Sequence, residues 1–222
     1  FKEYGLRMSE ISITEMYKEL LDNPNIRNLK RINARRLYTQ IKQAQFESGY
    51  PFEINDDHVN NENPLKNIGR IKMSNLCTEI LQTQETSIIG DYGDEDEIGL
   101  DVSCNLGSID IHRSTQVANF DELVNTAMRL LTSVSTMTNI KNVPSVAKAN
   151  ELMHSVGLGV MNLHGHLMTA NIQYGSNDAI AFVDAYGEAL NYFSIKASME
   201  IAKEKKQKFH NFESSTYATG EY

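Results

Sequence analysis

The most informative stretch of the sequence is Ser74-Asn75-Leu76-Cys77-Thr78-Glu79-Ile80. If this stretch is a β-strand, its side chains alternate, so that Asn75, Cys77 and Glu79 share one face. Neighbours on one face of a strand stand roughly 6.5–7 Å apart, and three polar groups at that pitch can surround a single sugar ring. The plain alternative is a half-exposed strand with an incidental cysteine, because Asn-x-Cys-x-Glu arises by composition in about one such sequence in a hundred.

A second cysteine lies in a similar setting, in the stretch Asp101-Val102-Ser103-Cys104-Asn105-Leu106-Gly107-Ser108-Ile109. We expect strands at about 71–81 and 100–111, with the thiols of Cys77 and Cys104 lining one cavity. A shared site requires the two thiols to lie within about 10–12 Å, the scale of two strand spacings. The sequence has two cysteines in all, too few for a disulfide scaffold, so they are either buried small hydrophobic residues or catalytic thiols.

The composition is that of a folded protein with a hydrophobic core. The 222 residues are 41% hydrophobic and 23% charged, and the net charge of −8 argues against binding to the nucleic-acid backbone. No run reaches the roughly 18 apolar residues of a membrane span, and the start does not resemble a secretory signal. We expect a cytoplasmic protein that contacts neither nucleic acid nor membrane. Because the sequence opens on Phe1, we treat it as a segment of a longer chain.

Apolar periodicity predicts a helix-rich α/β fold. Helical spacing is present at 12–22, from Asn33 to Gly49, at 123–137, in a pair around 145–170, and after Ser176. The pair is interrupted near Gly157 and Gly159, which suit close helix packing or a helix start. Residues 52–70 show little periodicity and predict a long connection, and 91–97 form an acidic loop between the two predicted strands.

Two groups of residues could suggest a metal site, and neither has the required spacing. In the acidic loop, Ile98 and Asn105 fall where a calcium loop needs its fifth and twelfth ligand positions. His164 and His166 point to different faces of a helix, and His154 lies ten residues before the first of them. We therefore expect a solvated loop tip and no bound metal in this chain.

The two cysteine stretches read as a specific pair of motifs, Ser-Asn-Leu-Cys-x-Glu-Ile and Ser-Cys-Asn-Leu-Gly-Ser. Three flanking stretches accompany them, at 45–51, 157–165 and 217–222. Together they resemble the large, catalytic subunit of ribonucleotide reductase in its class Ib form, over essentially the whole chain. The resemblance implies a ten-stranded α/β barrel, of which residues 1–222 form the central part as a single unit.

The resemblance also implies roles for individual residues. Cys77 becomes a thiyl radical that removes hydrogen from C3′ of a ribonucleotide, and Glu79 is the base for the 3′-hydroxyl proton. Asn75 hydrogen-bonds the sugar hydroxyls, and Cys104 is half of a redox-active dithiol. Substrate binding is expected along the run Asn75, Leu76, Cys77, Thr78 and Glu79. Such chemistry needs a carboxylate base near neutral pH and a dithiol that stores two electrons.

Partners follow from the same resemblance. The activity is that of a ribonucleoside-diphosphate reductase, which supplies deoxyribonucleotides for DNA replication. Substrates are ribonucleoside diphosphates, the radical comes from the metal cofactor of a separate small subunit, and a thioredoxin- or glutaredoxin-type protein is the reductant. Three parts of the subunit are expected outside these 222 residues. They are the partner thiol of Cys104, the sites for ATP and other nucleoside triphosphate effectors, and the tail that bears tyrosines and cysteines. The full-length subunit is expected to be a homodimer, and this segment alone to be inactive.

The two cysteines are also compatible with two other classes of function. A helical interaction module would carry inert, buried cysteines that resist iodoacetamide, whereas thiols that face a substrate cavity react. A cysteine hydrolase with Cys77 as nucleophile would need a nearby histidine, and the sequence offers only remote candidates such as His58 and His112.

Overall fold

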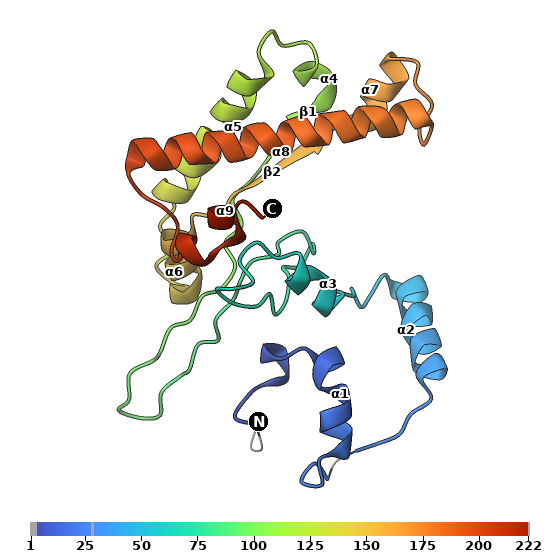
Figure 1. The fold of residues 1–222 in the computed structure, drawn as a ribbon, viewed down its shortest axis with the longest axis vertical. Coiled ribbons are helices and arrows are strands. Elements are labelled where there is room, and N and C mark those ends of the chain that lie inside the picture. The colour runs from blue at the N-terminus through green and yellow to red at the C-terminus, as the bar shows by residue number, and fades with distance from the viewer. Residues whose placement is uncertain (1–3, 28, 222) are drawn as a thin grey trace. The chain divides into compact units, whose positions relative to one another are not determined.

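The computed structural model describes residues 4–27 and 29–221, which form two compact units (Figure 1). The first unit comprises the residues up to Glu85 together with those from Glu213 onward, and the second comprises Thr86–Phe212. Among the described residues, no helix is both long and apolar enough to cross a membrane.

The first unit is built from short helices and irregular segments. Its elements are η1 (Met8–Glu10), α1 (Ile13–Asp22), α2 (Ala34–Ser48), α3 (Asp56–Asn61) and α9 (Thr216–Thr219), with η2 (Phe212–Ser214) at the border. The predicted helices at 12–22 and from Asn33 to Gly49 are confirmed. The side chain of Asn33 caps the first turn of α2 by accepting from the amide of Arg36, and Gly49 ends the helix with φ at 79°.

Two expectations for the first unit are wrong. The stretch 52–70 is not a plain connection, because it contains α3, a helix of six residues whose polar side chains hide its period. In addition, the part of the chain described at 71–81 contains no strand. Its extended backbone is held by side chains instead of by a ladder of backbone hydrogen bonds, as shown below.

The second unit has a small parallel sheet covered by helices. Its elements are β1 (Leu106–Asp110), α4 (Ile111–Ser114), α5 (Phe120–Met137), α6 (Pro144–Met153), β2 (Gly157–Met161), α7 (Leu163–Thr169) and α8 (Asn177–Lys205). Strands β1 and β2 pair in register from Leu106 opposite Gly157. The interruption predicted near Gly157 is therefore a strand, not a close contact between helices. A Cβ on Gly157 would lie 2.6 Å from Cδ2 of Leu106, so a larger residue there would require the Leu106 side chain to move.

The core of the second unit lies where α5 and α8 pack on each other, with α5 also contacting both strands (Figure 1). Its buried members are Ile109, Val124, Met128, Ala197 and Ile201. The helices predicted at 123–137 and after Ser176 supply most of this core, and both are confirmed. Arg129 of α5 adds a two-pronged ion pair to Glu204 of α8, with both N–O distances at 2.7 Å.

Candidate active site

The motif around Cys77 is a tight loop in the first unit. Asn75 closes it, because its Oδ1 accepts hydrogen bonds from the amides of Glu79 and Ile80, each at 3.1 Å. The amide of Thr78 also donates to the carbonyl of Asn75, and Thr78 has a φ of 64°. The predicted strand with alternating faces is therefore wrong, since a short amide side chain offers the backbone an alternative to a strand.

The loop brings together two of the three predicted catalytic side chains. Nδ2 of Asn75 donates to Oε1 of Glu79 at 2.7 Å. Cys77 lies at the apex of the loop and is exposed, and the neighbouring Leu76 is 80% exposed. A carboxylate that an amide holds in place, two residues from an accessible thiol, is an arrangement suited to proton transfer in a reaction that the thiol begins.

Side chains hold the two ends of the loop next to each other. The hydroxyl of Ser74 donates to the carbonyl of Ile80 at 2.8 Å. Further out, the buried Gln84 accepts from the amides of Lys72 and Met73, both at 2.9 Å, and donates to the carbonyl of Met73. These contacts replace the hydrogen-bond ladder of a sheet, so the loop has a fixed base although neither flank is a strand.

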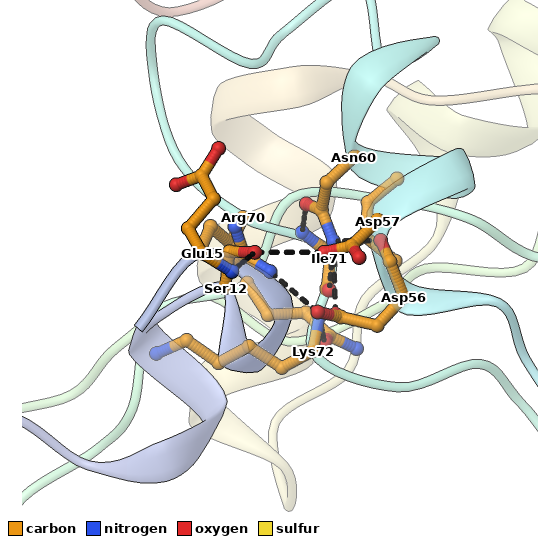
Figure 2. A network of polar contacts seen from close by, with 9 residues as sticks. Ser12, Glu15, Asp56, Asp57, Asn60, Arg70, Ile71 and Lys72 are labelled. Carbon is orange, nitrogen blue, oxygen red and sulfur yellow. Dashed lines mark hydrogen bonds and ion pairs between the residues drawn. The ribbon is translucent and has the colours of Figure 1, made fainter. Parts of the chain in front are cut away.

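A polar network anchors the segment that leads into the loop (Figure 2). Asn60 of α3 bonds both backbone groups of Ile71, accepting from its amide at 2.9 Å and donating to its carbonyl at 3.1 Å. Arg70 pairs with Asp56 at 2.7 Å, while the hydroxyl of Ser12 reaches Asp57 at 2.9 Å. The loop is thus tied through its leading segment to α3, which is linked in turn to α1.

The charge of Asp57 is favoured at this anchor. Hydrogen bonds from the side chains of Thr14 and then Ser12 lower the pKa of Asp57 below its usual range. Both donors lie at the start of α1, so an ionised Asp57 keeps this helix attached to α3.

Cys77 borders an open cavity of about 420 Å³. The cavity is lined by Gln45, Gly49, Pro51, Phe52, Glu53, Cys77 and Thr78. Gln45 shapes the wall opposite the loop by donating to the carbonyl of Pro51 at 2.6 Å, and it accepts from Lys42 at 3.0 Å. Lys42 also pairs with Glu53, and this hydrogen bond lowers the pKa of Glu53 below its usual value.

Sequence reasoning did not assign Gln45, Glu53 or Lys42 to the site. The signal was available in the motif stretch 45–51, of which Gln45 is the first residue. The motif identified the stretch as characteristic of the family, but spacing alone could not show that it folds back beside Cys77.

Cys104 lies in the second unit, two residues before β1, and is exposed. The predicted strand at 100–111 is therefore confirmed only for its second half. Because both cysteines are exposed, the reading of them as buried small hydrophobic residues is wrong. The expectation that Cys77 and Cys104 line one cavity stays a prediction.

The histidines have local partners in the second unit. Nδ1 of His112 lies 3.4 Å from Nδ1 of His166, and Nε2 of His112 lies 2.9 Å from the side-chain Nε2 of Gln116. His166 also stacks on Phe182, with ring centroids 4.4 Å apart. Across residues 4–27 and 29–221, no three His, Cys, Asp or Glu side chains gather as a metal site would require.

Known proteins are similar to this chain in sequence and in fold. A family model described as "Ribonucleotide reductase, barrel domain" matches residues 2–222. The alpha subunit of ribonucleoside-diphosphate reductase from Bacillus subtilis (strain 168) is 45% identical over all of this chain, which covers 32% of that protein. The alpha subunit from Mycoplasma pneumoniae is 44% identical over the whole chain, which covers 30% of it.

A solved structure agrees on the fold. The class Id ribonucleotide reductase alpha subunit of Actinobacillus ureae superposes with a TM-score of 0.63 at 21% identity, over 85% of this chain and 34% of that one. The expected fold class, a helix-rich part of the reductase barrel, is confirmed. The chain spans about a third of the length of these Bacillus and Mycoplasma subunits. It belongs to the ribonucleotide reductase barrel-domain family.

Proposed function

We propose that this chain carries the thiyl-radical site of a ribonucleoside-diphosphate reductase alpha subunit, the enzyme that reduces ribonucleoside diphosphates to deoxyribonucleotides. The observation that carries the proposal is the loop in which Asn75 holds Glu79 at 2.7 Å beside the exposed Cys77. The proteins named as alpha subunits of this enzyme, at 44–45% identity over the whole chain, support it.

The loop geometry supports a division of labour among its side chains. The Cys77 thiyl takes the hydrogen atom from C3′ of the substrate, which leaves a carbon radical there. Glu79 takes the 3′-hydroxyl proton, and because Asn75 engages Oε1 of its carboxylate, Oε2 is the proton acceptor. Proton removal of this kind by a positioned carboxylate contributes roughly 10²–10⁴-fold to a rate.

The reduction itself needs two electrons. The C2′–O bond breaks and the oxygen leaves as water, while Cys104 and a second thiol give up two electrons and two protons and become a disulfide. The hydrogen atom then returns from Cys77 to C3′, which regenerates the thiyl radical. We place the second thiol in a part of the subunit upstream of this segment, as the family resemblance implies.

The same proposal covers the partners. The radical on Cys77 is generated through a separate small subunit with its metal cofactor, and a thioredoxin- or glutaredoxin-type protein reduces the disulfide. We also propose that the full-length subunit is a homodimer and that nucleoside triphosphates bind it as effectors. The open cavity beside Cys77, bounded by Gln45, Phe52 and Glu53, is the place where we expect the ribose to enter.

The test uses the complete subunit that contains this chain, with its small subunit, a chemical dithiol and a ribonucleoside diphosphate. Cys77→Ser should abolish turnover and leave substrate affinity within about twofold, because a hydroxyl keeps the size but cannot form a comparable radical. Glu79→Gln should bind substrate and still exchange the C3′ hydrogen while product formation stalls. Substantial deoxynucleotide production by Cys77→Ser would refute the assignment of the radical to this residue.

A cysteine hydrolase is less well supported. Both ring nitrogens of His112, one of the two histidines considered as its base, are engaged by His166 and Gln116. Release of an acyl or peptide product by the wild-type chain, lost in Cys77→Ser, would favour that class instead.

A further inference from the structure

The second unit contains a cluster of four buried polar side chains with Asn150 at its centre. Its members are Ser103, Asn105, Ser135 and Asn150, each between 2% and 7% exposed. Oδ1 of Asn150 accepts three hydrogen bonds: from Ser103 Oγ at 2.9 Å, from Asn105 Nδ2 at 3.0 Å and from Ser135 Oγ at 3.0 Å. Its Nδ2 donates to the backbone carbonyl of Ser135 at 2.7 Å.

Two members of this Asn150 cluster are the immediate neighbours of Cys104. Along 103–109 the buried positions are Ser103, Asn105 and Ile109, while Cys104, Leu106 and Ser108 are exposed. Because side chains alternate along an extended backbone, neighbours that are held inward force the residue between them outward. The single oxygen of Asn150 holds both neighbours, so it sets the direction of the Cys104 thiol.

The backbone beside Cys104 is fixed as well. The carbonyl of Asn105 accepts from the amide of Gly157 at 2.9 Å, which extends the β1–β2 pairing by one residue. Nδ2 of Asn105 also donates to the carbonyl of Ser155 at 3.0 Å. The chain is therefore held on the C-terminal side of Cys104 through Asn105, and on its N-terminal side through Ser103.

Packing alone does not call for this arrangement. Burying polar groups is costly unless every group is bonded, and apolar side chains of similar volume would fill the same space without that requirement. A fully bonded buried network does, however, fix one geometry for the segment that it holds. The segment fixed here carries an exposed thiol.

We propose that Asn150 is a positioning residue for the redox step at Cys104, because it anchors Ser103 and Asn105 and so holds the thiol toward its oxidation partner. This inference rests on the proposed function, in which Cys104 and a second thiol are oxidised together to a disulfide. Misplacement of reacting groups by about 1 Å can cost as much as 100-fold in rate. Loss of the anchor should therefore slow disulfide formation without changing substrate binding.

Two serines provide a matched pair of variants. Ser103→Ala and Ser135→Ala each remove one hydroxyl that donates to Asn150 Oδ1, at 2.9 and 3.0 Å, and both sites are 2–3% exposed. The Ser103 hydroxyl also accepts from Asn105 Nδ2 at 3.1 Å. Only Ser103 is a sequence neighbour of Cys104. After loss of the Ser135 hydroxyl, Asn150 still donates to the Ser135 carbonyl and keeps its place.

The variants are assayed in the complete subunit with its small subunit. Asn150→Ala should lower kcat by about 10- to 100-fold and Ser103→Ala by about three- to tenfold, with KM unchanged and C3′ hydrogen exchange retained. The kcat of Ser135→Ala should stay within about twofold of wild type although its Tm also falls, because it too loses a buried hydrogen bond. Equal kcat for the two serine variants, or a change confined to KM, would overturn the proposal.

A second readout does not depend on turnover. In the folded protein, the rate of iodoacetamide alkylation at Cys104 is measured relative to that at Cys77, which lies in the other unit. We expect this ratio to fall at least about twofold in Ser103→Ala and Asn150→Ala, because a released thiol spends part of its time turned inward. An unchanged ratio in both would overturn the positioning role. A wild-type subunit that makes no deoxynucleotide would refute the proposed function instead, and the alkylation ratio would still decide the role of Asn150.

Discussion

Asn60→Ala tests whether side chains, rather than a sheet, hold the segment that leads into the Cys77 loop. Asn60 bonds the amide of Ile71 at 2.9 Å and its carbonyl at 3.1 Å, as Figure 2 shows. Both residues are buried, at 8% and 4% exposure. The alanine variant removes both hydrogen bonds to Ile71 at once and leaves the backbone of α3 intact.

The expected magnitude follows from these two bonds. A buried backbone group that loses its partner costs about 1–3 kcal/mol, so the variant, which removes the partners of two such groups, should lose about 2–6 kcal/mol of local stability. Water can enter beside the partly exposed neighbours of Ile71, which favours the lower end of that range. At 1.4 kcal/mol per factor of ten, a loss of about 2 kcal/mol increases local opening roughly 30-fold.

Hydrogen exchange at the Ile71 amide, resolved by NMR, measures this opening directly. The matched control is Asn61→Ala, which makes the same change one residue later at an exposed position of α3. Ile71 should lose about 30-fold in protection in Asn60→Ala and less than about threefold in Asn61→Ala. Equal losses in the two variants would mean that the helix, not the Asn60 side chain, holds the segment, and protection close to wild type in both would refute the anchor.

Three further predictions concern stability. Gly69→Ala should destabilise the first unit by about 1–3 kcal/mol in a denaturant titration, because the added Cβ would lie 2.5 Å from Thr83 Cγ2. Gly187→Ala, with nothing within 4 Å of its Cβ in the exposed middle of α8, should instead stabilise the second unit by about 0.5–1 kcal/mol. Burial, and then the charge of Lys205, lower the pKa of His154 below its usual 6.5. Neutral His154 therefore contributes stability that is fully present above pH 6.5. This stability is lost as the pH falls through the lowered pKa of His154. The Tm of wild type should therefore drop more between pH 7.5 and 5 than that of His154→Asn, which tolerates the same left-handed backbone; equal drops would exclude His154 as the cause.

The helices could be predicted from the sequence because their signals are local. Ser12, Asn33 and Ser176 each cap a helix with their own side chains, next to apolar residues at helical spacing. The strand β2 could not be predicted in this way. Its residues Gly157–Met161 include two glycines with low strand propensity, and it forms because β1, about fifty residues earlier, offers a parallel partner.

The residues of the candidate site were accessible to sequence reasoning, but their geometry was not. A spacing of i, i+2 and i+4 for the polar residues, with Leu76 and Thr78 between them, is what a strand shows, and nothing local in 74–80 excludes it. The turn depends on Asn75 accepting from the amides of Glu79 and Ile80, and on Gln84 and Asn60 holding the flanks. These contacts join residues up to 12 positions apart. The periodicity of apolar residues along the sequence contains no information about them.

The difference between strand and turn changes the role that Asn75 can have. In a strand, residues 75 and 79 would lie about 13 Å apart along the chain, at 3.3 Å per residue, so their side chains could meet only through a bound substrate. In the loop the two side chains meet directly, because Nδ2 of Asn75 donates to Oε1 of Glu79 at 2.7 Å. The carboxylate of Glu79 is then held in place by an amide that also closes the loop, so binding need not order it. Under the proposed function, the main role of Asn75 is therefore to position the Glu79 base, and its hydrogen bonds to the sugar are a secondary role.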